Sequence, residues 1–218
     1  LRDIYNKAKE NILDTCIGCG KCIRVCPVIS GTELQGQSAG AIQKKVLNFL
    51  RAPFHDQALY NKAFACIACF KCSDNICPEN LNPVVINELI KWGHHQAGFD
   101  VPSYHEPTAP KSRQRILSSL QTDYREYCRI SEEEICETEA HEGVVFFPGC
   151  NVYYQPDKIL AARDVLEKTG KPYSFLPGLD NCCGNIHMLT GDVEGAERVY
   201  AKFVDKLRQL KTKKIICW

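Results

Sequence analysis

The sequence predicts an α+β protein, with an all-α N-terminal part followed by an α/β part that contains a small parallel sheet. Residues 1–93 carry apolar side chains at helical spacing around two clusters of cysteines. From residue 143 the pattern changes to short apolar runs that alternate with helical segments. Strand, helix, strand, helix and strand in this order indicate a parallel α/β unit.

Four helices are expected in the N-terminal part. Their predicted ranges are 1–13, about 42–50, about 56–65 and 82–93. The fourth begins at Asn82-Pro83, because asparagine caps helix N-termini and proline favours the first helical position. It is predicted to end at Gly93, since glycine is common at helix C-termini. The cysteine clusters would then lie in loops between helices.

A linker is expected over residues 94–142, with one helix near 112–121. Its acidic stretch, Glu132 to Glu142, holds six glutamates and is predicted to be a solvated surface. An α/β domain is expected over residues 143–218. Its predicted elements are strand 144–147, helix 156–169, strand 173–176, helix 193–210 and strand 215–218.

The composition argues against several classes of protein. A net charge of +1 over 218 residues disfavours a nucleic-acid footprint or a polybasic membrane patch. No apolar run approaches the roughly 18 residues of a membrane-spanning helix, and no signal-peptide pattern opens the chain. The chain starts at Leu1 and stops at Trp218, just after a cysteine, and both ends are expected to be cut.

The unusual feature of the composition is its 14 cysteines. Most of them cluster at two-residue gaps, in a chain long enough to bury a normal core, so disulfides would add little stability. Metal ligation in a reducing compartment, the cytoplasm, is the better interpretation. Two cysteines, Cys128 and Cys136, match no motif.

Two cysteine runs follow the Cys-x2-Cys-x2-Cys-x3-Cys-Pro spacing by which bacterial ferredoxins bind [4Fe–4S] clusters. They are Cys16, Cys19, Cys22 and Cys26 before Pro27, and Cys66, Cys69, Cys72 and Cys77 before Pro78. The second run has one extra residue before its last cysteine. Three thiolates at two-residue gaps wrap one cubane, and in two-cluster proteins the fourth cysteine binds the other cluster.

We therefore expect two cysteine sets that exchange their last members. The first cluster set is Cys16, Cys19, Cys22 and Cys77, and the second cluster set is Cys66, Cys69, Cys72 and Cys26. Zinc is the alternative, but structural zinc sites favour paired Cys-x2-Cys knuckles with four ligands per ion. Lys21 and Lys71 lie inside the runs, where they either raise a cluster's potential or are simply solvated.

A third group of cysteines follows the predicted strands of the C-terminal part. It comprises Cys150, the adjacent Cys182 and Cys183 before Gly184, and Cys217. Parallel α/β folds bind ligands at the C-terminal ends of their strands, where these cysteines are expected. Adjacent cysteines rarely ligate an ordinary cubane, but they can bridge irons in a distorted cluster.

These motifs resemble two known kinds of domain. The helical segment around the ferredoxin runs is similar to the α-helical ferredoxin domain of fumarate reductase and heterodisulfide reductase subunits. The third group resembles the CCG cysteine-rich domain of heterodisulfide reductase, anaerobic glycerol-3-phosphate dehydrogenase and glycolate oxidase complexes. The order of the two domains resembles heterodisulfide reductase-like iron–sulfur subunits, including that of class II benzoyl-CoA reductase complexes.

The resemblance implies a third, noncubane [4Fe–4S] cluster held by the third group. Its ligands would be Cys150, Cys182, Cys183 and Cys217. The family pattern ends in Cys-x-x-Cys, and its last cysteine would fall two positions beyond Trp218, so the CCG domain is expected to be incomplete.

Together these features predict an iron–sulfur electron-transfer subunit of a multi-subunit anaerobic oxidoreductase complex. It would pass single electrons between two cubane clusters and the noncubane cluster. Without a G-x-G-x-x-G sequence, hydride chemistry is expected from a partner. The expected partners are other redox subunits (flavoprotein, iron–sulfur or cytochrome), and any association with a membrane would be through them. The alternatives are a catalytic heterodisulfide reductase subunit and a zinc-stabilised assembly module.

Overall fold

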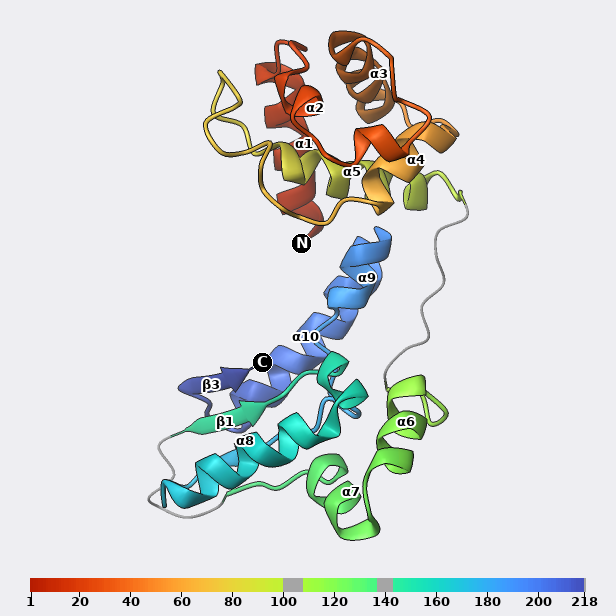
Figure 1. Ribbon diagram of the computed structural model, residues 1–218. Helices are drawn as coiled ribbons and strands as arrows, with labels where there is room; N and C mark the ends of the chain where they lie inside the picture. Colours follow the sequence, from red (N-terminus) through yellow and green to blue (C-terminus); the bar gives the residue numbers. More distant parts are fainter. Residues whose placement is uncertain (100–107, 137–142, 218) are drawn as a thin grey trace. The chain divides into compact units, whose positions relative to one another are not determined.

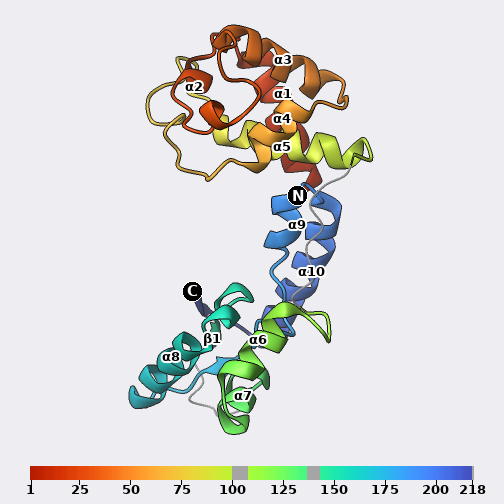
Figure 2. The ribbon, with the colours of Figure 1, turned by 45° about the vertical axis from the view of Figure 1, so that its right-hand side comes forward.

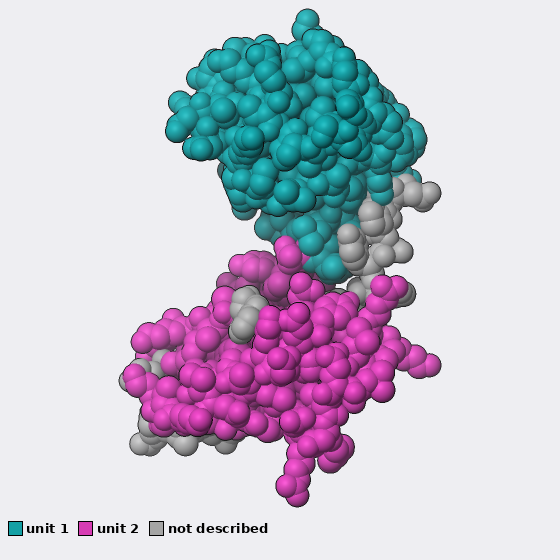
Figure 3. Space-filling view, viewed as in Figure 1, with its two compact units in different colours: residues 1–103, 186–197 teal, residues 104–185, 198–218 magenta. Residues whose placement is uncertain are grey.

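The computed structural model of the protein describes residues 1–99, 108–136 and 143–217. The chain divides into two compact units (Figure 3). Unit 1 consists of residues 1–103 and 186–197, and unit 2 consists of residues 104–185 and 198–218. The segment expected to form the α/β domain therefore contributes a short piece of chain to unit 1.

Unit 1 is helical, as predicted (Figure 1). Its helices are α1 (Arg2–Thr15), α2 (Lys21–Arg24), α3 (Ala39–Arg51), α4 (Gln57–Phe64) and α5 (Pro83–Gln96), with the 3-10 turn η1 (Ile29–Gly31). Most of α9 (Asn185–Thr190) and the first residues of α10 (Val193–Gln209) also belong to it. Helix α5 packs against α1, α3 and α4 (Figure 2), and their buried apolar residues form one core.

Helix α5 begins as predicted but ends later. The Asn82 side chain accepts a hydrogen bond from the Val84 amide at 3.1 Å, and Pro83 occupies the first turn. The prediction that the helix ends at Gly93 is wrong, because α5 continues to Gln96. Gly93 serves packing instead, since a Cβ there would lie 2.7 Å from the Phe49 ring.

Unit 2 contains the predicted parallel sheet. Its elements are α6 (Arg113–Gln121), α7 (Tyr124–Ser131), β1 (Val144–Phe147), the 3-10 turn η2 (Asn151–Tyr154), α8 (Pro156–Lys168), β2 (Ser174–Phe175), most of α10 and β3 (Lys214–Cys217). The strand order is β2-β1-β3, and both pairings are parallel. Phe146 of β1 packs in a cluster with Ile159 of α8. Val145 and Phe147, on either side of Phe146 in the strand, pack in another cluster with Phe203 of α10. The two helices therefore cover opposite faces of the sheet.

Two glutamates of the acidic stretch after α7 form specific contacts that the sequence did not predict. Glu134 pairs with Phe175 of β2 through two backbone hydrogen bonds of 2.7 and 3.1 Å. Its carboxylate binds the buried Arg163 guanidinium, and Glu133 forms an ion pair with Lys206 at 2.9 Å. Both glutamates are exposed, as predicted for a solvated surface, and they also form these specific contacts. Residues 137–142 lie outside the described residues.

A membrane span is not found in the described part of the chain, where no helix combines the necessary length with the necessary apolar character.

Candidate metal centres

The four cysteines of the first cluster set line one cavity of unit 1. Cys16 follows α1, Cys22 lies in α2, Cys77 precedes α5, and Cys19 lies between the first two. About 360 Å³ of space lies between these residues, part of it open to solvent. None of the four forms a disulfide. The structure thus brings the predicted set together, and ligation of one cluster by these thiols remains a prediction.

The loop that carries these cysteines depends on left-handed backbone. Gly18 and Gly20 both have φ of +72°, a conformation that costs other residues about 1–2 kcal/mol. In the second run, Ala68 (φ +50°) and Phe70 (φ +58°) occupy the matching positions. The two cysteine loops therefore turn in the same way, although only the first has glycines.

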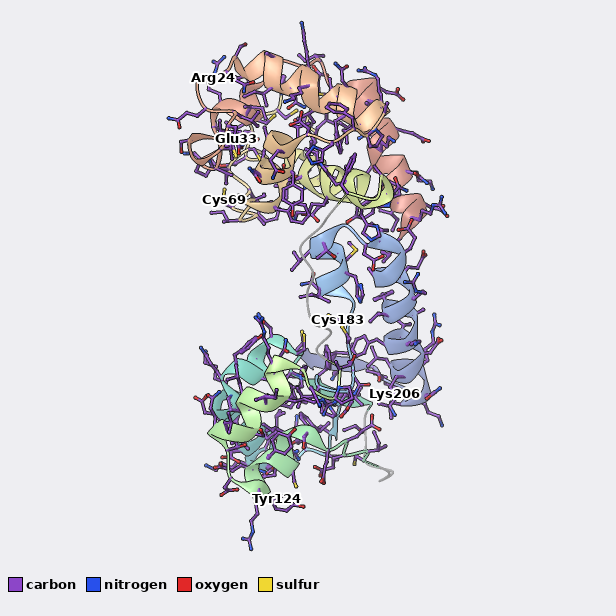
Figure 4. All side chains as sticks on the ribbon, turned by 90° about the vertical axis from the view of Figure 1, so that its right-hand side faces the viewer. Arg24, Glu33, Cys69, Tyr124, Cys183 and Lys206 are labelled. Carbon is purple, nitrogen blue, oxygen red and sulfur yellow. The ribbon has the colours of Figure 1, made fainter. Side chains whose placement is uncertain are left out.

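The second cluster set is gathered less completely. Cys26 and Cys72 line a second cavity of about 280 Å³. The charge of Cys66 acts on Cys72, so it also lies close. Cys69 is exposed on its loop beside Phe70 and lines a separate, open depression of the surface (Figure 4).

The two cavities share part of their lining. Cys22, Gln43, Pro83 and Ile86 border both of them. The buried Gln43 amide lies between two sulfurs of the first cluster set: its Nε2 donates to Cys16 Sγ at 3.5 Å, and its Oε1 accepts from Cys22 Sγ at 3.6 Å. Amide hydrogen bonds to ligand sulfurs are one means by which proteins set cluster potentials.

A buried lysine borders the second cavity. Lys62 of α4 donates a hydrogen bond from Nζ to Asn87 Oδ1 of α5 at 2.5 Å. Burial lowers the pKa of this lysine, and the neighbouring cysteine thiolates oppose that shift. Lys21 and Lys71, which the sequence singled out, are both exposed. The sequence did not single out Lys62, which lies in α4 four residues before Cys66.

The electrostatics of the first cavity show what a bound metal would have to supply. Burial raises the pKa of the Cys22 thiol to about 11, and the charge of Lys62 partly offsets this. A buried thiolate therefore needs a nearby cation, and metal ligation must displace the thiol proton. Soft thiolate donors in groups of four suit an iron–sulfur cluster or zinc. The donor set thus fits the predicted clusters.

Three of the four cysteines in the third group lie together in unit 2. Cys150 follows β1, and burial raises its pKa to about 11, with a further rise from Cys182 and Cys183. Cys183 is exposed (Figure 4), and the Gly184 amide donates to Cys182 Sγ at 3.4 Å. Cys217 ends β3, where it pairs in register with Phe147 of β1.

A buried tyrosine holds the loop of Cys150 in place. The Tyr153 hydroxyl donates to the Ile130 carbonyl at 2.5 Å and accepts from the Gly178 amide at 3.1 Å. Gly178 lies so close to the backbone before Cys150 that a Cβ would fall 2.1 Å from the Gly149 carbonyl oxygen. The loops that carry Cys150 and Cys182 are thereby packed against each other.

Two histidines gain partners that the sequence could not reveal. His187 lies in α9 and contacts Asp192 Oδ2 through Nδ1 at 2.8 Å. His95 Nε2 lies 3.8 Å from Asp192 Oδ1, and Glu194 is near. The Asp192 carboxylate also caps α10 through the Gly195 amide. These contacts belong to unit 1 and account for the aspartate without a bound ion.

The sequence matches two known domain families. Residues 12–81 match the 4Fe-4S dicluster domain, and residues 144–217 match the cysteine-rich CCG domain. These ranges contain the two ferredoxin runs and the third group of cysteines. The chain therefore combines a dicluster iron–sulfur domain with a cysteine-rich domain, as the motifs predicted.

Curated relatives of the chain include proteins of Methanosarcina and Methanococcus species. The chain is 24 % identical over 226 residues to a subunit of the dihydromethanophenazine:CoB–CoM heterodisulfide reductase of Methanosarcina barkeri, covering 94 % of this chain and 54 % of the relative. The corresponding protein of Methanosarcina mazei is also 24 % identical, with the same coverage of each chain. An uncharacterized iron–sulfur protein of Methanococcus maripaludis is 24 % identical, over 92 % of this chain and 41 % of the relative.

The chain spans about half the length of the curated relatives it matches. No solved structure matches it significantly.

Proposed function

We propose that this chain, an iron–sulfur protein with a 4Fe–4S dicluster domain and a CCG cysteine-rich domain, is an electron-transfer subunit of a multi-subunit anaerobic oxidoreductase complex. The observation that carries the proposal is the cavity lined by all four cysteines of the first cluster set. These residues are distant in sequence, yet they converge as the exchange of last cysteines between two ferredoxin runs requires.

The residues of unit 1 would bind two clusters side by side. The first cluster set would hold one and the second cluster set the other, and each bound [4Fe–4S] cluster supplies reversible one-electron transfer. Cys22 and Gln43 border both cavities, so the two sites would be neighbours. The exposed Cys69 would bring the second site close to the surface of unit 1, where a redox partner can approach.

The third group would hold a further cluster in unit 2. Cys150, Cys182 and Cys183 would supply thiolates from two loops that Tyr153 and Gly178 hold together. Cys217 would contribute from the end of β3. The noncubane type of this cluster rests on the resemblance to the CCG domain.

Iron analysis of anaerobically purified protein tests the proposal. We expect about eight iron atoms and eight sulfides per chain from the first two sites, with EPR signals of reduced cubanes. The variant Cys77→Ser should lose the first cluster, whereas the control Cys128→Ser changes a cysteine outside every set and should keep all iron. Protein that binds zinc stoichiometrically and no iron would contradict the proposal and favour an assembly module.

A catalytic heterodisulfide reductase is the second candidate, and the grouping of Cys150 with Cys182 and Cys183 favours it. Reduction of a heterodisulfide takes two electrons and two protons and releases two thiols. The chain would be incubated anaerobically with a heterodisulfide and reduced viologen as electron donor. Thiol release that Cys183→Ser abolishes would support catalysis, and intact clusters without thiol release would exclude it for this chain.

A further inference from the structure

Lys62 is a buried cation beside cysteines of both cluster sets. It is 5 % exposed, and Nζ is bound by the neutral Asn87 amide oxygen at 2.5 Å. Burial lowers the pKa of Lys62, and the charges of nearby cysteines oppose that shift. An ammonium group is costly to bury without a counter-charge, so this position suits an anionic cluster as its partner.

Lys62 has more neighbours in the second cluster set than in the first. It borders the second cavity, together with Cys26 and Cys72, and it does not border the first. Of the four cysteines whose charge acts on it, Cys26, Cys66 and Cys72 are members of the second cluster set. The fourth is Cys22 of the first cluster set, which borders both cavities and acts on Lys62 less than Cys26 but more than the other two.

We propose that Lys62 is a positioning charge that raises the reduction potential of the cluster held by the second cluster set relative to that of the first. The inference rests on the proposed function. A cubane held by four thiolates is anionic and becomes more negative on reduction, so a nearby cation stabilises its reduced state more than its oxidised state. Lys62 therefore favours the second cluster as the site at which a single electron rests.

The exposed lysines of the cysteine runs should act more weakly. Lys21 and Lys71 are close in sequence to ligand cysteines, but solvent and salt screen their charges. Lys62 is close in sequence only to Cys66, but because its side chain is buried, water does not screen its charge. Lys71→Gln is therefore a matched control, because it removes a positive charge from the loop of the second cluster set at an exposed position.

The experiment is a redox titration of the full chain, loaded anaerobically with iron and sulfide and followed by EPR. Lys62→Gln removes the charge but keeps a donor for Asn87, Lys62→Met is a second neutral variant, and Lys62→Arg keeps the charge. We expect the neutral variants to change the reduction equilibrium of one cluster tenfold or more, a shift of about 59 mV to lower potential for one electron. In the neutral variants, the potential of the other cluster should shift by less. In Lys62→Arg and Lys71→Gln, the potentials of both clusters should shift by less.

The outcomes distinguish failure of this inference from failure of the proposed function. Two clusters in the wild-type protein with unchanged potentials in Lys62→Gln would overturn the inference and leave the proposed function intact. An equal shift in Lys62→Arg would overturn it too, since charge would not be the cause. Wild-type protein without [4Fe–4S] clusters would overturn both. If both neutral variants lost the second cluster and Lys62→Arg kept it, the result would support a role for the positive charge at position 62 in stabilising that cluster.

Discussion

The glycines of the first cysteine loop allow a quantitative test of how tightly α3 constrains it. Gly18 and Gly20 share a φ of +72°, so alanine at either position costs about 1–2 kcal/mol for left-handed backbone. Their surroundings differ. A Cβ on Gly18 would meet its nearest atoms at 4.0 Å, whereas a Cβ on Gly20 would lie 2.4 Å from the Ala39 carbonyl group at the start of α3.

The clash at Gly20 should remove the first cluster. Carbon atoms pack at about 3.5–4.0 Å, so Gly20→Ala requires the loop or α3 to move by about 1 Å. Metal and catalytic sites tolerate displacements of only about 0.5 Å. Cys19 and Cys22 flank Gly20, and their displacement should release about four iron atoms per chain. In Gly18→Ala the iron content should stay at the wild-type value.

Iron and sulfide analysis of both variants, with EPR of the reduced proteins, measures the effect. For a chain of this size, a loss of 1–2 kcal/mol lowers the thermal midpoint by about 2–8 °C, and Gly18→Ala should show only this change. If Gly20→Ala kept the full iron content, α3 would not constrain the loop. Equal iron loss in both variants would show that left-handed backbone alone decides cluster binding.

Three further predictions concern other parts of the chain. Cys26→Ser should remove the EPR signal of the second cluster and spare that of the first, and the opposite result would refute the exchange of last cysteines. Tyr153→Phe leaves the Ile130 carbonyl and the Gly178 amide without their buried partner, so unfolding in denaturant should show a loss of about 1–3 kcal/mol; an unchanged midpoint would refute this. Burial lowers the pKa of His94, so the folded state resists protonation while the unfolded histidine titrates near 6.5. The wild-type protein should therefore lose stability relative to His94→Phe as the pH falls from 7.5 to 6.0, and parallel melting temperatures would contradict the reasoning.

The sequence predicted the elements whose determinants are local. Short gaps between Cys16, Cys19 and Cys22 constrain the loop that carries them, so their shared cavity follows from local sequence. Cys77 joins them from a distant run, and only the exchange of last cysteines known from two-cluster ferredoxins predicted its place. Helix α7 could also have been predicted, since Asp123 and Glu126 form a capping box at its start. Gly93 misled the prediction because the same residue type that ends helices also allows close packing, here against the Phe49 ring.

Contacts between distant segments could not be predicted in the same way. Lys62 and Gln43 occupy ordinary helical positions, and nothing in their local sequence distinguishes them from solvated residues. Their burial beside the cysteines depends on how α3 and α4 pack against α5. Glu134 is a similar case, because its role depends on the buried Arg163 and on the edge of β2.

The two cysteine loops share a backbone conformation although the residues between their cysteines differ. Glycine at two positions of the first loop is easily explained by its left-handed backbone, but Ala68 and Phe70 adopt the same conformation at a cost of about 1–2 kcal/mol each. The 55 % exposed Phe70 side chain is only partly buried and can regain little of that cost through packing. Strained backbone persists where the surrounding structure requires it, most often at functional sites. The repeated Cys-x2-Cys-x2-Cys spacing, and not the residues between the cysteines, therefore sets the shape of both loops.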